Sequence, residues 1–193
     1  RGPDEKKYLF GKNYAFGTNR LAIQKIKKGQ QPIDDGRFIL GFNGEIFNYE
    51  ILKKNIIDQN VIESEIELIL YLYKKYGSDF VYKLKGQFAI YIYDKFNNKI
   101  FLFRDRFGIR PLFYSIDKKN GEIIFASECK AILKVSKISH DVSKKGMAQT
   151  SMFWTTVGEQ SAFDEIKQLT PSFFIEIDKK LNVNLKKYEN IFK

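Results

Sequence analysis

The chain has 193 residues and a net charge of +10, and 44% of its residues are hydrophobic and 16% aromatic. This composition excludes a disordered chain, and the length suits one domain with a buried core. The basic charge does not indicate a nucleic-acid partner, because the lysines occur singly or in pairs among acidic residues and form no basic block with interleaved aromatic residues.

Other classes are disfavoured by the same counts. One cysteine excludes an intramolecular disulfide and fits a reducing compartment, so we expect a cytoplasmic protein. One histidine leaves a zinc site or a Ser–His–Asp triad short of members, so we expect no metal site. No apolar run approaches the roughly 18 residues of a membrane span, and the opening residues do not resemble a signal peptide.

The first predicted elements are two β-strands, at 14–23 and 37–43, separated by a loop that contains Gly29, Pro32 and Gly36. The stretch GFNGEIFNY at 41–49 raises a question, because Asn-Gly between apolar runs is a strong turn signal. On the residues alone, a tight turn at Asn43-Gly44 is the favoured interpretation.

Helices are predicted next. Residues 48–58 are expected to be helical, and a clearer helix begins at Ser64, which forms an S-x-x-E capping box with Glu67. Apolar residues then recur with helical spacing, and Gly77 stands just past the expected end.

The second half of the chain predicts mostly strands. Two nearly continuous apolar strands, at 87–94 and 99–105, are joined by the polar turn KFNN, so both faces of their sheet should be covered. The remaining predicted elements are strands at 111–117 and 122–127 around the turn Asn120-Gly121, a short helix at 128–134, and a closing hairpin of 173–178 with 182–188. Residues 136–165 show little pattern. No crossover helices occur over 86–126, which favours an α+β layered sandwich of antiparallel sheets.

Several stretches, taken in order, resemble one family: RGPD, NRLAI, QP, NGEIFNY, SEIELIL, LKGQFAIYIYD, LFRDRFGIRPLFY and FASECKAIL. In this order they are similar to the glutamine-hydrolysing domain of asparagine synthetases, which are class II, or N-terminal-nucleophile (Ntn), glutamine amidotransferases. The resemblance covers nearly the whole chain. It implies a four-layer αββα sandwich of the Ntn hydrolase type, here lacking its first strand and helix.

The resemblance also implies roles for individual residues. It places the oxyanion hole at the side-chain amide of Asn43 and the backbone N–H of Gly44, which reverses the turn interpretation. Arg20 matches the arginine that binds the substrate α-carboxylate, for which a guanidinium fork is well suited. The other substrate-binding residues it implies are Leu21 and Ile23, through their backbone groups, Glu45 beside the same pocket, and Glu65.

Two positions depart from the family pattern. Glu65 stands where the family has an aspartate that binds the substrate α-ammonium, and an added methylene moves the charge by roughly 1.5 Å. Lys25 stands where the family often has an acid. Asp105 and Arg106, with Gly108 and Pro111, are interpreted as structural residues of a turn. His140 and Cys129 are interpreted as bystanders.

The family nucleophile is an N-terminal cysteine, and this chain begins at Arg1 with no Cys-Gly-Ile start. Three explanations stay open: a fragment, a removed segment, or a protein that never had the cysteine. We therefore expect residues 1–193 to form a single glutaminase domain, truncated at both ends, without its synthetase domain.

In the complete protein the domain would hydrolyse L-glutamine to glutamate and ammonia. The synthetase domain of the same polypeptide would use ATP and Mg²⁺ to convert aspartate to asparagine, and no cofactor is expected in this domain. The alternative is a catalytically inactive domain that serves as a scaffold or partner surface. A homodimer is left open.

Overall fold

The structure is a computed structural model that describes residues 2, 4–20, 29–56, 62–134 and 138–189. Its strands are β1 Glu5–Gly11, β2 Tyr14–Arg20, β3 Ile33–Asp34, β4 Phe38–Ile46, β5 Gly86–Asp94, β6 Lys99–Arg104, β7 Phe113–Asp117, β8 Glu122–Ala126, β9 Lys167–Gln168, β10 Phe173–Ile177 and β11 Val183–Lys187. Its helices are α1 Tyr49–Lys54, α2 Glu65–Tyr76, the 3-10 helix η2 Gly77–Lys83, α3 Cys129–Ile132 and α4 Lys144–Phe153.

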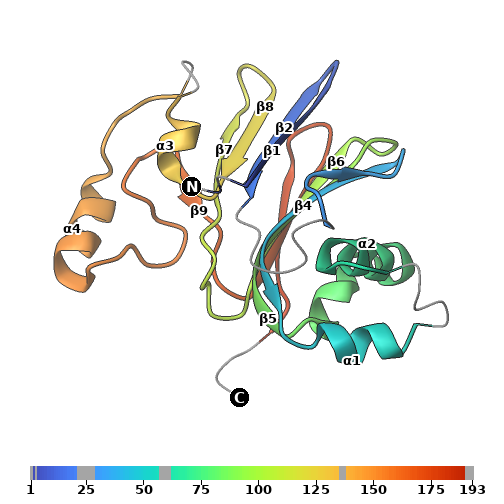
Figure 1. Cartoon of the computed structure of the whole chain (residues 1–193). Coiled ribbons are helices and arrows are strands. Elements are labelled where there is room, and N and C mark those ends of the chain that lie inside the picture. The colour runs from blue at the N-terminus through green and yellow to red at the C-terminus, as the bar shows by residue number, and fades with distance from the viewer. Residues whose placement is uncertain (1, 3, 21–28, 57–61, 135–137, 190–193) are drawn as a thin grey trace.

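The strands form three antiparallel sheets. The large sheet has the order β11-β10-β6-β5-β4-β3, and two smaller sheets have the orders β1-β2 and β8-β7-β9. Figure 1 shows α1 and α2 on one side of the large sheet, the smaller sheets on its other side, and α3 and α4 beyond them. The predicted αββα sandwich is therefore confirmed.

Alternation along the strands builds the apolar layers. Leu40 belongs to the core cluster under the helices, whereas its neighbour Ile39 belongs to the cluster between the large sheet and the smaller ones. Phe103 and Leu102 of β6 divide between the same two clusters. Adjacent side chains of a strand point to opposite faces, so both faces of this sheet are covered, as the apolar runs predict. A third cluster, around Ile132, lies under α3.

Helix α2 follows its sequence signals. Ser64 is its N-cap, the carboxylate of Glu67 accepts the backbone N–H of Ser64 at 3.0 Å, and Gly77 is its C-cap. The apolar face of α2 contributes Ile66 and Ile69 to the cluster that it shares with the large sheet. The packing of this apolar face against the large sheet places the first turn of α2 beside the end of β4.

The tight turn that Asn43-Gly44 indicates on the residues alone does not form. Strand β4 continues to Ile46, and Asn43 and Gly44 pair with Ala89 and Phe88 of β5 in unbroken register. The long partner strand supplies pairing that a local turn signal does not anticipate, and Gly44 adopts a φ of 151° without leaving the sheet. The chain reverses after Ile46, at Phe47 and Asn48.

The sequence did not predict β1 or α4, nor the short elements β3, η2 and β9. Strand β1 pairs along its whole length with β2, and α4 occupies part of the weakly patterned stretch 136–165. The hydroxyl of Ser143 caps α4 by accepting the N–H of Gly146, and a Cβ at Gly146 would lie 2.0 Å from the Ser161 carbonyl oxygen. Close contact with a distant loop, which periodicity cannot report, therefore places α4. Residues 21–23 of the predicted strand at 14–23 lie outside the described residues.

The turn that follows β6 is organised by one buried carboxylate. Asp105 is fully buried and accepts backbone N–H groups from Phe88, Phe107, Ile109 and Arg110, at 2.9–3.1 Å. These contacts agree with the interpretation of Asp105 as a structural residue.

Arg106 is also engaged in structural contacts. Its guanidinium donates to the carbonyl of Leu84 and forms an ion pair with Glu189.

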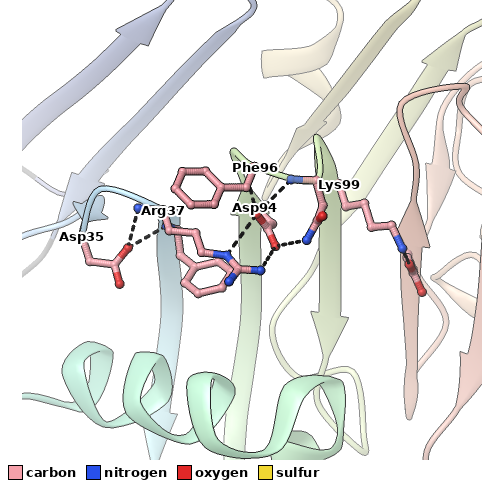
Figure 2. Close-up of polar contacts among 8 residues, drawn as sticks. Asp35, Arg37, Asp94, Phe96 and Lys99 are labelled. Atoms are coloured by element: carbon pink, nitrogen blue, oxygen red, sulfur yellow. Dashed lines mark hydrogen bonds and ion pairs between the residues drawn. The ribbon is translucent and has the colours of Figure 1, made fainter.

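Asp94 has a similar part in the turn between β5 and β6. Its carboxylate accepts the backbone N–H groups of Phe96 and Asn97, the Asn97 side-chain amide, and the guanidinium of Arg37 at 2.9 Å (Figure 2). Burial acts to raise the pKa of Asp94, but the hydrogen bonds from Arg37 and Asn97 outweigh it and hold this pKa below its ordinary value. These contacts join the β5–β6 turn to Arg37, which directly precedes β4.

Candidate functional site

A cavity of about 1130 Å³ lies where the large sheet, the smaller sheets and the start of α2 meet. Its lining includes Arg20 from β2, Asn43, Gly44 and Glu45 from β4, and Glu65 from α2. On its other side it is bounded by the residues that join β8 to α3. The structure thus brings the described residues of the predicted site, which are far apart in the sequence, to one cavity.

The sequence of β4 explains how this strand can face two environments. Phe42 and Ile46 point into the core under the helices, so the alternate positions of the strand face the smaller sheets. Those positions are Gly41, Asn43 and Glu45, which are small or polar. Gly41 has no room for a side chain, because a Cβ there would lie 2.2 Å from the ring of Tyr91. The face of β4 toward the cavity is therefore polar and open.

Position 44 requires glycine. A Cβ built at this position would lie 2.0 Å from the carbonyl oxygen of Gln87 and 2.7 Å from the Cα of Phe88, and its φ of 151° is unfavourable for other residues. Both clashing atoms belong to the backbone of β5, which cannot move aside without separating two central strands.

Arg20 ends β2 beside the cavity. Its side chain is 13% exposed, and its Nη1 lies 3.4 Å from Oε2 of Glu5, its partner across the β1–β2 pair. A Cβ on Gly29 would lie 3.7 Å from Nη2 of Arg20 and 3.1 Å from Cβ of Ser64. The guanidinium therefore lies close to Ser64, the N-cap of α2, with Gly29 between them, where a side chain would fit only tightly.

Two carboxylates share the cavity with this guanidinium. Glu45 is partly buried on the open face of β4, and Glu65 is the first residue of α2. Oε1 of Glu65 accepts the backbone N–H of Ile46 at 2.5 Å, so the helix start is tied to the end of β4. Carboxylates beside a guanidinium suit a ligand that carries both charges, such as a free amino acid.

Aromatic rings connect the sheets that carry these groups. The ring of Tyr91 on β5 stacks on Phe16 of β2 with centroids 5.1 Å apart, and lies 5.0 Å from the ring of Phe125 on β8. Burial raises the pKa of the Tyr91 hydroxyl, so it stays neutral. Sequence reasoning missed Tyr91 and the buried Gln31, both of which line the cavity.

The other residues considered in the sequence analysis either lie away from this cavity or lie outside the described residues. Leu21 and Ile23, like Lys25, lie outside the described residues. Cys129 and His140 are not among the residues that line the cavity, and burial raises the pKa of the Cys129 thiol. Within the described part of the chain, no three His, Cys, Asp or Glu side chains gather as metal ligands would, and no helix is long and apolar enough to span a membrane.

Comparison with known proteins shows the family to which the chain belongs. The model of the glutamine amidotransferase domain family matches residues 1–189. The chain belongs to this family. The amidotransferase domain described here is 37% identical over 180 residues to asparagine synthetase [glutamine-hydrolyzing] 2 of Bacillus subtilis, covering 92% of this chain and 23% of that protein. It is 32% identical over 163 residues to asparagine synthetase B [glutamine-hydrolyzing] of Escherichia coli, covering 82% and 28%.

A solved structure of glutamine phosphoribosylpyrophosphate (PRPP) amidotransferase from B. subtilis, complexed with ADP and GMP, shares the fold of the amidotransferase domain. It aligns with a TM-score of 0.60 over 91% of this chain and 35% of its own, at 19% identity. The domain spans about a quarter of the length of the two curated relatives above.

Proposed function

We propose that this domain hydrolyses L-glutamine to glutamate and ammonia as part of a glutamine-hydrolysing asparagine synthetase. The ammonia would amidate aspartate in a synthetase domain of the same polypeptide, with ATP and Mg²⁺, in the cytoplasm. The observation that carries the proposal is the single cavity shared by the Arg20 guanidinium and the Asn43–Gly44 segment. The names of the relatives, all glutamine-hydrolysing asparagine synthetases, support it.

The substrate would be held by both of its ends. Arg20 would bind the α-carboxylate through its planar fork, and the carboxylates of Glu45 and Glu65 are the candidates for the α-ammonium. Backbone groups at Leu21 and Ile23 would hold the side-chain carboxamide.

Asn43 and Gly44 would act on the reacting carbonyl. Attack on the carboxamide carbon places a negative charge on its oxygen, and donors fixed in advance stabilise this oxyanion strongly. The Asn43 side chain lies on the face of β4 toward the cavity, and Gly44 lets the backbone approach a ligand closely. The resemblance implies a cysteine thiolate as nucleophile, with a thioester that water then hydrolyses.

Replacement of Asn43 tests the oxyanion assignment. In the full-length protein, Asn43→Ala should lower glutamine turnover by about 10²–10³-fold, the effect typical of removing one oxyanion donor. Asparagine formation from free ammonia should be retained. Asn184→Ala, on the exposed strand β11, is the matched control and should leave both activities unchanged. Unchanged glutamine turnover in Asn43→Ala would contradict the assignment.

Glutamine binding tests the proposal against a purely structural role of the domain. Calorimetric titration of the full-length protein with L-glutamine should show binding, and Arg20→Ala should abolish it, because the α-carboxylate would lose its guanidinium partner. Absence of binding in the unmodified protein would favour a scaffold.

A further inference from the structure

We propose that Gln31 and Glu65 are positioning residues, which hold β4 on both sides of Gly44 so that the Gly44 N–H points into the cavity. This inference rests on the proposed function and extends it to two side chains that act through Gly44. It assigns Glu65 a role other than the one that its place in the family pattern implies.

The first observation is that the outer edge of β4 is only partly paired. Strand β3 pairs with β4 at Leu40 and Ile39 alone, so the edge beyond Leu40 lacks a neighbouring strand among the described residues. Two side chains take the place of that strand. Oε1 of Gln31 accepts the N–H of Phe42 at 2.7 Å, and Oε1 of Glu65 accepts the N–H of Ile46 at 2.5 Å.

The direction of the Gly44 N–H follows from strand alternation. In an antiparallel pair, the N–H groups of residues i, i+2 and i+4 point to the same edge. Those of Phe42 and Ile46 point outward to their side-chain acceptors, so that of Gly44 points outward between them. The unbroken register with β5 contains no inserted residue that would reverse this order.

The partner residue on β5 agrees with this direction. Phe88 lies opposite Gly44, and its N–H is donated to Asp105, while its carbonyl accepts the N–H of Asp105. Both polar backbone groups of Phe88 therefore point away from β4. Gly44 and Phe88 form a non-hydrogen-bonded pair, which leaves the Gly44 N–H on the cavity side.

Loss of either acceptor would disturb this arrangement. Gln31 is 8% exposed, so its removal would leave a buried Phe42 N–H without a partner, which is unfavourable. The edge could then shift to find another acceptor, and a displacement of about 1 Å at a reacting group can cost 10²-fold in rate.

The length of Glu65 matters for the same reason. Aspartate at this position would be shorter by one carbon–carbon bond, roughly 1.5 Å, and its carboxylate could not reach the Ile46 N–H from the same backbone. The glutamate that departs from the family pattern is therefore the residue that makes this contact. Glu45, on the open face of β4, is then the carboxylate assigned to the α-ammonium.

Hydrogen–deuterium exchange of the full-length protein, followed in peptides that contain Ile46, tests the positioning independently of any activity. Glu65→Asp should raise the exchange rate of this segment at least tenfold, whereas Glu65→Gln, whose amide oxygen can still accept the bond, should keep most of the protection. Glu63→Asp is the matched control on the exposed residue two positions earlier. Equal protection in Glu65→Asp and the unmodified protein would overturn the proposal.

Kinetics distinguish positioning from ammonium binding. If Glu65 positions β4, Glu65→Asp should lower kcat for glutamine at least tenfold and leave KM within about threefold of its original value. Glu65→Gln should then be the milder variant. If Glu65 instead binds the substrate α-ammonium, Glu65→Asp should keep full activity and Glu65→Gln should raise KM strongly. This result would overturn the proposal. A full-length protein without glutaminase activity would refute the proposed function, while the exchange measurement would still decide the positioning.

Gln31 has its own pair of variants. Gln31→Leu keeps the approximate volume but removes the acceptor, and it should speed exchange at Phe42 and lower kcat with little change in KM. Gln30→Leu makes the same change at the exposed neighbour and should do neither. Loss of kcat in both variants, or in neither, would contradict the assignment of Gln31.

Discussion

Gly44→Ala is the sharpest perturbation of the site, because its consequences can be worked out from distances. The new Cβ would lie 2.0 Å from the Gln87 carbonyl oxygen, whereas ordinary contact begins near 3.4 Å, so β4 and β5 would have to move apart by about 1.4 Å. Such overpacking typically costs about 1–3 kcal/mol, and a displacement of this size at a reacting group can cost about 10²-fold in rate.

Gly121→Ala is the matched control for this substitution. Gly121 also has a positive φ, of 71°, but a Cβ there would meet nothing within 4 Å, so this variant carries the backbone strain without the clash. The two variants should therefore differ by about 2 kcal/mol in the free energy of unfolding, and Gly44→Ala should have the lower Tm. Thermal unfolding and glutamine turnover of the full-length protein measure both effects. Equal Tm and equal turnover in the two variants would refute the clash.

Two further predictions concern the buried carboxylates. Asp105→Ala leaves four backbone N–H groups without their acceptor and should lower the free energy of unfolding by about 3 kcal/mol or more in urea titration; a loss below about 1 kcal/mol would contradict its structural role. Asp94 has its pKa held below the ordinary value, so its contribution to stability is complete above about pH 4 and is lost as the pH falls through the folded pKa. The stability deficit of Asp94→Asn should accordingly be largest at pH 7 and shrink between pH 4 and pH 2, and a deficit that does not change with pH would refute this assignment.

Local signals predicted much of the fold. The capping box at Ser64 and Glu67 marks the start of α2, because it satisfies backbone groups within one turn. The nearly continuous apolar runs of β5 and β6 indicated a sheet covered on both faces, which the divided environments of Leu102 and Phe103 confirm. These features depend on residues close in sequence, so the amino-acid sequence alone is enough to recognise them.

Features that depend on distant partners were not predictable in the same way. On the residues alone Asn43-Gly44 indicates a turn, because the pairing with β5 that excludes a turn involves residues distant in sequence. Helix α4 likewise depends on the close contact of Gly146 with the distant Ser161. At the site, the pattern indicated which residues gather but not the bond from Glu65 to Ile46. That bond joins two elements whose approach is set by the whole core.

The rings of Phe16, Tyr91 and Phe125 fill the space between the sheet that carries Arg20 and the sheet that carries Gly44. The thickness of this aromatic layer therefore fixes how far the guanidinium stands from the amide donor. Under the proposed function, this separation selects among amino acid amides by length, since asparagine is shorter than glutamine by one methylene, roughly 1.5 Å. Enlarging or trimming Phe16, which lies behind Tyr91 and Phe125 and does not itself line the cavity, would then change which of the two amides is hydrolysed faster.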